Sequence, residues 1–242
     1  QNIRSEKNWY FESLGLLNNL NHIALILDGN KRWAKKNKLS NTKGYTNGFE
    51  NIKKIVKYSQ SINLQNLTIF ALSSENYKRS SVNIIYEIIY KNFANTFKEL
   101  VKENGVKINI FGSRENLPTK LIEIFNKIEE ASKNNNNINL NIAFNYGFKD
   151  EIKNILNKIQ NSNKSYKFQD DIEINNLFYL GSFPDPDLLI RTGGYKRLSN
   201  FIMYNLTYTE LFFVDTLWPD FTEQEFHSII KDYFKINRKY GL

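Results

Sequence analysis

The strongest constraint on the fold is a regular alternation of short apolar runs with longer amphipathic segments. This alternation is typical of βαβ units, in which successive strands lie parallel. We expect strands at residues 22–27, 67–72, 106–111, 138–143, 187–190 and 210–213. We expect helices at 48–61, 82–104, 117–133, 148–160 and 223–234, the last with Thr222 as its N-cap. The pattern predicts an α/β fold whose largely parallel central sheet, of about six strands, is flanked by helices.

The chain is expected to form a single domain. Its 242 residues suffice for one sizeable core, and neither an internal repeat nor a linker divides them. Residues 1–20 are assigned to an N-terminal helical extension and residues 21–242 to the main domain. The polar segments 133–137 and 161–170 are predicted to be surface loops.

Composition excludes several classes of protein. The absence of cysteine excludes disulfides, thiolate catalysis and cysteine-ligated zinc, and two histidines are too few for a histidine-rich metal site. No apolar run approaches the roughly 18 residues of a membrane span, and no signal peptide is recognised, so we expect a soluble, cytoplasmic protein. The net charge of +8 points to an anionic partner, but it does not separate nucleic acid, membrane surface and phosphorylated ligand.

Polar and charged residues collect directly after five of the predicted strands. They include Asp28-Gly29-Asn30, Ser73-Ser74-Glu75-Asn76, Gly112-Ser113-Arg114, Asn145-Tyr146-Gly147 and Arg191-Thr192-Gly193-Gly194. Ligands of open α/β sheets bind at the carboxyl ends of the strands. Ordinary turn chemistry explains the Gly, Asn and Ser residues but does not require Asp28, Arg32 or Arg191. We therefore expect a site at this edge of the sheet.

Two of these segments predict anion sites. In HIALILDGNKRWAKK (22–36), a helix begins near Lys31, and its free N–H groups suit a phosphate. Asp28 would repel a bare phosphate, which favours a bridging Mg²⁺ and hence a magnesium–pyrophosphate site. In LLIRTGGYKRLSNF (188–201), Arg191 is followed by two glycines, two further cations and Ser199, an expected helix N-cap. Neither segment matches GxxxxGK[ST] or GxGxxG, so nucleotide binding is not supported.

Five segments, in their order and spacing, together resemble the cis-prenyltransferases, such as undecaprenyl and dehydrodolichyl diphosphate synthases. They are HIALILDGNKRWAKK, FALSSENYKRS, LNIAFNYG, LLIRTGGYKRLSNF and YTELFFVDTLWPDF, and the resemblance runs from about residue 21 to the end. It implies a Mg²⁺-dependent transferase that adds isopentenyl diphosphate units to an allylic diphosphate, with farnesyl diphosphate as the expected starter. Each addition makes a cis double bond, and the product is a Z-polyprenyl diphosphate for dolichol or undecaprenol synthesis.

The resemblance also implies residue roles. Asp28 would hold Mg²⁺ and help diphosphate leave, Asn76 is the candidate for proton removal, and Glu210 is the second acidic residue of the metal site, often contributed across subunits. The grip on the allylic diphosphate is implied for Gly29, Asn30, Lys31, Arg32 and Trp33, together with Asn41 and Tyr45, where the family usually has Arg and His. The loop between the substrates is implied to contribute Ser73, Ser74, Glu75, Tyr77 and Arg79. The isopentenyl diphosphate clamp would be Arg191, Arg197, Leu198 and Ser199, whereas Tyr195 stands where Glu is common.

A hydrophobic product tunnel is expected between the helices at 48–61 and 82–104. The helically spaced residues of the second helix suit either a tunnel or ordinary core packing; they are Ile84, Ile85, Ile88, Ile89, Phe93 and Phe97. A homodimer is expected, because the aromatic-rich segment 204–221 exceeds what one strand can bury. Peripheral membrane association through the lipid product, at the endoplasmic reticulum in a eukaryote, is a further expectation.

Three alternatives were weighed. A non-enzymatic accessory subunit, or a weakly active one, would have the same fold and need a partner. The retained Asp28, Asn76 and Arg191 argue against it. A nucleic-acid-binding protein would carry its charge in stripes with exposed aromatics, whereas the Arg residues here cluster at strand ends. A trans-prenyltransferase would need DDxxD helices, and the pair Asp170-Asp171 lies in a polar tract without that pattern.

Overall fold

A computed structural model describes residues 20–77, 82–162, 168 and 170–238 of the protein. The helical extension expected over residues 1–20 thus lies outside the described residues, except for Leu20, which is buried in the core. Arg79 also lies outside them. No helix among the residues that the structure describes is long and apolar enough to cross a membrane.

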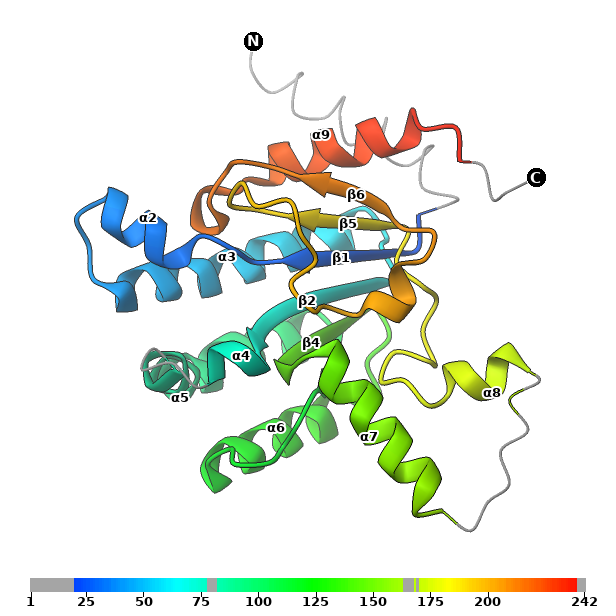
Figure 1. The fold of residues 1–242 in the computed structure, drawn as a ribbon. Coiled ribbons are helices and arrows are strands. Elements are labelled where there is room, and N and C mark those ends of the chain that lie inside the picture. The colour runs from blue at the N-terminus through cyan, green and yellow to red at the C-terminus, as the bar shows by residue number, and fades with distance from the viewer. Residues whose placement is uncertain (1–19, 78–81, 163–167, 169, 239–242) are drawn as a thin grey trace.

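The described chain forms one parallel six-stranded sheet in the order β3-β4-β2-β1-β5-β6 (Figure 1). Its strands are β1 (His22–Ile26), β2 (Asn66–Ser73), β3 (Val106–Phe111), β4 (Ile138–Tyr146), β5 (Leu188–Arg191) and β6 (Glu210–Phe213). Each lies within a few residues of its predicted range, because a buried parallel strand is a nearly continuous apolar run in sequence. The predicted fold class is confirmed.

Helices connect and cover the strands. They are α2 (Asn30–Lys36), α3 (Asn41–Ser61), α4 (Ser74–Tyr77), α5 (Val82–Lys98), a π-helix η2 (Glu99–Glu103), α6 (Thr119–Ser132), α7 (Phe148–Gln160), α8 (Asp171–Asn175), α9 (Glu223–Phe234) and two 3₁₀ turns, η3 (Met203–Leu206) and η4 (Trp218–Asp220). Thr222 caps α9 as predicted, since its hydroxyl accepts a hydrogen bond from the N–H of Glu225 at 3.1 Å.

The start of α3 was predicted wrongly. The helix begins at Asn41, where the Ser40 hydroxyl caps it, and not at residue 48. Gly44 and Gly48 lie inside the helix because they face a close neighbour. A Cβ on Gly44 would stand 2.3 Å from the carbonyl oxygen of Asn30, and one on Gly48 would meet the Asn30 side chain at 2.1 Å. These glycines permit α2 and α3 to pack tightly together.

The sheet separates two apolar layers. Along β1, Ile23 and Leu25 face a large core shared with α3, α5, α6 and α9, whereas Ala24 and Ile26 face a smaller core on the opposite side. The smaller core is closed by α7 and by the segment that leads into η3 (Figure 1). Both faces of the sheet are thus covered, which leaves the carboxyl ends of the strands as the accessible polar edge.

His22 is a buried polar residue in this sheet. Its ring nitrogens lie 2.6 Å from the Pro184 carbonyl oxygen and 2.6 Å from the Thr68 hydroxyl. A neutral ring satisfies both partners by donating to the carbonyl and accepting from the hydroxyl. Burial lowers the pKa of His22 from 6.5 to about 4. The folded protein therefore holds this ring uncharged across the mildly acidic range.

We predict that acidification destabilises the protein through His22. Between pH 6.5 and about 4 the unfolded chain binds the proton and the folded chain does not. Stability should therefore be complete above pH 6.5 and fall as the pH drops, by up to about 1.4 kcal/mol per pH unit. Denaturant unfolding of the protein and of a His22→Gln variant from pH 7 to pH 4 measures this. The variant should show a shallower decline, and equal slopes would contradict the prediction.

Candidate active site

The site lies where β1 and β5 run side by side. Ile26 pairs with Arg191, so Asp28 and Arg191 emerge at the same edge of the sheet. One Asp28 carboxylate oxygen accepts a hydrogen bond from Arg191 at 3.0 Å, and the other accepts one from Arg32 of α2 at 3.0 Å. The order of the strands reverses at this point, which is the usual position of ligand sites in open parallel sheets.

The backbone around Asp28 is fixed from both neighbouring segments. The Thr192 hydroxyl lies 3.0 Å from the amide nitrogen and 2.9 Å from the carbonyl oxygen of Asp28. The N–H of Trp218 donates to the same carbonyl at 3.0 Å. Gly29 follows with a φ of 119°, a backbone conformation that other residues rarely adopt. The carboxylate is thus held in place by a rigid frame.

Arg191 is a buried cation with an unusual set of partners. Only 3% of its surface is exposed, and besides Asp28 it donates to the Ser199 hydroxyl at 2.6 Å and to the Arg197 carbonyl. Its Nε is buried and has no hydrogen-bond partner among the residues that the structure describes. Buried charges are normally fully paired, so the incomplete pairing of this guanidinium is an unusual feature of the site.

Ser199 does not cap a helix, contrary to the sequence-based expectation. Its φ of 51° and the φ of 63° at Asn200 place both residues in left-handed conformation, whereas an N-cap residue is extended. The next helix, η3, starts at Met203. The hydroxyl of Ser199 is instead turned back to accept from Arg191.

A polar pocket of about 630 Å³ covers this region, a size typical of small-molecule sites. Four of its lining residues are cations and two are acidic; they are Lys31, Arg32, Arg191, Arg197, Asp28 and Glu75. Because the cations outnumber the acidic groups, the pocket suits a ligand with several negative charges. The structure thus brings together the two predicted anion sites in one cavity.

The loop after β2 forms the third side of the pocket. Ser73 and Asn76 line it, and the Asn76 N–H donates to the Ser73 hydroxyl at 3.1 Å. Glu75 also lines it and accepts from the Asn200 side chain at 2.8 Å. This hydrogen bond ties the central loop to the Arg191 segment, 125 residues later in sequence.

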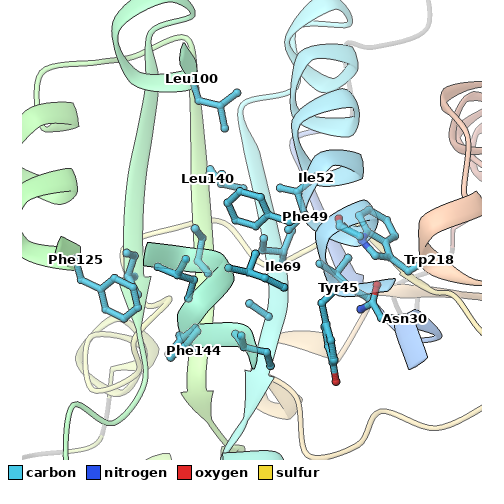
Figure 2. A pocket seen from close by; sticks show the side chains of 18 residues that line it. Asn30, Tyr45, Phe49, Ile52, Ile69, Leu100, Phe125, Leu140, Phe144 and Trp218 are labelled. Atoms are coloured by element: carbon cyan, nitrogen blue, oxygen red, sulfur yellow. The ribbon is translucent and has the colours of Figure 1, made fainter. Parts of the chain in front are cut away.

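An apolar cavity lies next to the polar pocket, between the sheet and helices α3 and α5 (Figure 2). The residues that line both spaces are Leu27, Asn30, Tyr45, Ala71 and Ile85. Figure 2 shows Asn30 and Tyr45 at one end of the cavity and Leu100, from the π-helix, at the other. The charged pocket and the hydrocarbon-lined cavity therefore adjoin each other.

Some of the residues expected in the tunnel line this cavity. Ile85, Ile88 and Ile89 do, whereas Ile84 does not. The side chains of Phe93 and Phe97 lie outside the description. The helical spacing of these residues did not distinguish Ile84 from Ile85, Ile88 and Ile89. In a helix rich in apolar residues, some of the apolar side chains face the cavity and others do not.

Several residues expected at the substrate lie away from the pocket. Trp33 donates to Asp220 at 2.6 Å, Ser74 donates to Asp150 at 2.7 Å, and the Tyr77 hydroxyl donates to the Asn116 carbonyl. Leu198 packs on the smaller core, and Asn41 is exposed at the start of α3. These side chains are not among the residues that line the pocket.

Glu210 lies apart from Asp28 within the chain. It occupies the first position of β6, beside Leu188 of β5, whereas Asp28 follows the last residue of β1. Its carboxylate is 3.9 Å from the Arg238 guanidinium. Within the described ranges no cluster of three His, Cys, Asp or Glu residues could hold a metal. The single Asp28 carboxylate nevertheless fits Mg²⁺, which typically takes one or two carboxylates together with substrate phosphate oxygens.

Sequence reasoning gave no role to three residues that shape the site. Thr192 fixes the Asp28 backbone, Asn200 joins two loops, and the Tyr195 ring lies against three arginines. Thr192 and Tyr195 flank two adjacent glycines, a signal that the backbone there is special. The contacts themselves depend on tertiary structure and have no local signature.

We predict that Gly193→Ala impairs anion binding, because a Cβ at this position would lie 2.5 Å from the Arg32 guanidinium. The control is Gly194→Ala, whose φ of 80° is close to the 84° of Gly193 but whose Cβ meets only Asp215. Both variants should lose about 1–2 kcal/mol of stability through backbone strain. Only Gly193→Ala should also weaken inorganic pyrophosphate binding, by about tenfold, as expected when a charge-assisted hydrogen bond is disturbed. Calorimetry that finds the same affinity for both would contradict this.

Comparisons with known proteins agree with this geometry. The family described as "Putative undecaprenyl diphosphate synthase" matches residues 26–241. An isoprenyl transferase from Aquifex aeolicus is 39% identical over 91% of this chain and 95% of its own length. A tritrans,polycis-undecaprenyl-diphosphate synthase (geranylgeranyl-diphosphate specific) from Thermococcus kodakarensis is 35% identical over 91% of this chain and 86% of its own.

Solved structures show the same relationship. A lavandulyl diphosphate synthase from Lavandula x intermedia, in complex with dimethylallyl diphosphate, has a TM-score of 0.84 at 29% identity and covers 92% of this chain and 98% of its own. A probable undecaprenyl diphosphate synthase from Campylobacter jejuni has a TM-score of 0.72 at 28% identity, covering 93% of this chain and 100% of its own. The chain belongs to the undecaprenyl diphosphate synthase family of cis-prenyltransferases.

Proposed function

We propose that the protein adds isopentenyl diphosphate units to an allylic diphosphate, with farnesyl diphosphate as starter, and makes a Z-polyprenyl diphosphate for lipid-carrier synthesis. One observation carries the proposal: the cationic pocket and the apolar cavity share their lining at Asn30 and Tyr45. An allylic diphosphate has the same division into a multiply charged head and a hydrocarbon tail. The homologous isoprenyl transferases support the reaction class.

The two diphosphates are assigned to opposite sides of the pocket. The allylic diphosphate is placed against Arg32 and the start of α2, since the tail can then pass Tyr45 into the cavity. Isopentenyl diphosphate is placed against Arg191, Arg197 and Ser199. Arg guanidinium groups suit this role because they bind phosphate oxygens through paired hydrogen bonds.

The chemistry follows from this arrangement. The bond between the allylic carbon and the diphosphate oxygen breaks, a carbon–carbon bond to the isopentenyl double bond forms, and one proton leaves the new chain. The arginines stabilise the negative charge that develops on the departing diphosphate. Asn76, which lines the pocket, is assigned to assist proton removal by hydrogen bonding, and an oxygen of the departing diphosphate takes up the proton. The apolar cavity keeps water from the carbocation-like carbon.

Mg²⁺ is proposed as the cofactor. Asp28 would hold it together with diphosphate oxygens, and the bound ion would neutralise charge on the leaving group. The carboxylate has room for this role, since two arginine hydrogen bonds use only part of its acceptor capacity. Asp28 would also keep Arg32 and Arg191 oriented toward the substrates.

We predict that the protein converts labelled isopentenyl diphosphate and farnesyl diphosphate into longer chains in the presence of Mg²⁺, with products sized by chromatography. Asp28→Ala should lower turnover on the order of 10³-fold or more, because an essential metal contact and the partner of a buried arginine are lost. Asp232→Ala, which removes an exposed carboxylate of α9, is the control.

Circular dichroism should show that both variants are folded. Near wild-type turnover by Asp28→Ala at saturating Mg²⁺ would contradict the role of Asp28. If the wild-type protein forms no product alone, the alternative of an accessory or weakly active subunit that needs a partner is favoured. The chain has Asn41 and Tyr45 where the family usually has Arg and His, which is why the assay of the protein without a partner is informative.

We further propose a homodimer that forms along the β6 edge of the sheet. β6 is the last strand on that side, and exposed apolar residues gather around it: 46% of Met203, 63% of Tyr208 and 43% of Leu211 is accessible. An open strand edge with an apolar surface favours pairing with a second copy. In a dimer, Glu210 of one subunit would contribute its carboxylate to the metal site of the other subunit. The long-chain product would keep the protein at a membrane surface.

We predict a dimer by light scattering at micromolar concentration and a monomer for Leu211→Glu. The introduced charge on the edge strand should oppose burial of this surface. Leu156→Glu is the matched control, since Leu156 is 59% exposed but lies on α7, away from the edge. A monomeric wild-type protein, or equal behaviour of the two variants, would contradict the proposed interface.

A further inference from the structure

Tyr195 is an exposed aromatic residue surrounded by cations. Its ring centre lies 4.3 Å from the guanidinium carbon of Arg197, 4.7 Å from that of Arg32 and 5.8 Å from that of Arg191. Arg32 belongs to α2, and the other two belong to β5 and the turn after it. One side chain thus touches both halves of the cationic pocket.

Packing alone does not account for this position, because the residue is 44% exposed and follows two glycines with positive φ. Electrostatics gives the Tyr195 ring a role. The three guanidinium groups repel one another, and Asp28 pairs with only two of them. In the described part of the chain no carboxylate pairs with the Arg197 side chain, which instead stacks near the ring.

An aromatic face differs from a carboxylate as a partner for arginine. The ring attracts the guanidinium through its negative face but leaves the N–H groups at the guanidinium edge free. A carboxylate would occupy those N–H groups and cancel one charge. The Tyr195 ring therefore holds the cations close together while the pocket keeps its positive charge for an anion.

We propose that Tyr195 is a positioning residue that joins the two anion subsites by holding Arg32, Arg191 and Arg197 around one ring. The assignment of the subsites to two substrates rests on the proposed function, whereas the effect on anion binding does not. Removal of the ring should therefore weaken both diphosphates, because it releases arginines from both sides of the pocket. A clamp residue that serves one side should affect one substrate.

The test compares Tyr195→Phe with Tyr195→Leu. Phe keeps the aromatic face and removes the hydroxyl, whereas Leu keeps apolar bulk and removes the face. Isothermal titration calorimetry with inorganic pyrophosphate, in buffer without divalent metal, measures anion binding directly. We expect the Phe variant to match the wild type and the Leu variant to bind about tenfold more weakly. Equal affinity of the Leu variant and the wild type, or no binding by the wild type, would overturn the proposal.

Steady-state kinetics separate positioning from a purely structural role. Tyr195→Leu should raise the KM for both substrates with a smaller effect on kcat. Tyr195→Phe should have the KM and kcat values of the wild type. Arg197→Lys, for comparison, should raise the KM for isopentenyl diphosphate far more than that for the allylic substrate. Melting temperatures should be alike for all variants, because the substituted residues Tyr195 and Arg197 are both exposed. If the wild type makes no product, the proposed function fails, while the pyrophosphate titrations still decide the role of Tyr195.

Discussion

The buried ion pair between Arg191 and Asp28 is the interaction on which the site depends. A guanidinium with 3% exposure costs several kcal/mol to bury unless carboxylate and hydroxyl partners surround it. Asp28 and Ser199 supply those partners. The parallel pairing of β1 with β5 brings Asp28 and Arg191 to the same edge of the sheet. The interaction therefore couples the sheet register to the shape of the pocket. Any change in the register would leave a buried charge unpaired.

The second constraint is the close packing of α2 against α3. Gly44 and Gly48 allow the Asn30 backbone and side chain to approach α3, and this contact holds Asn30 beside Tyr45. At that point the cationic pocket adjoins the apolar cavity. Charged head and hydrocarbon tail can be bound together only if the two environments adjoin. Helix packing, and not the site residues alone, produces this junction.

The comparisons show that one architecture serves different diphosphate chemistry. The solved structure with a TM-score of 0.84 is a lavandulyl diphosphate synthase, whereas the curated relatives are isoprenyl transferases and an undecaprenyl-diphosphate synthase. The fold alone thus does not select the reaction. Selection must come from the residues that line the pocket. Tyr195 is one of these lining residues, and its aromatic ring lies beside three arginines.

The sequence by itself determined the parallel sheet, its longer helices and the segments that carry Asp28, Asn76 and Arg191, because buried strands and strand-end motifs leave local patterns. It did not determine the start of α3 or the conformation of Ser199. Glycines inside a helix and a serine with positive φ are unfavourable locally, and only contacts with Asn30 and Arg191 make them stable. The arginine array around Tyr195 likewise required the tertiary structure, since its members come from segments more than 150 residues apart that only the sheet brings together.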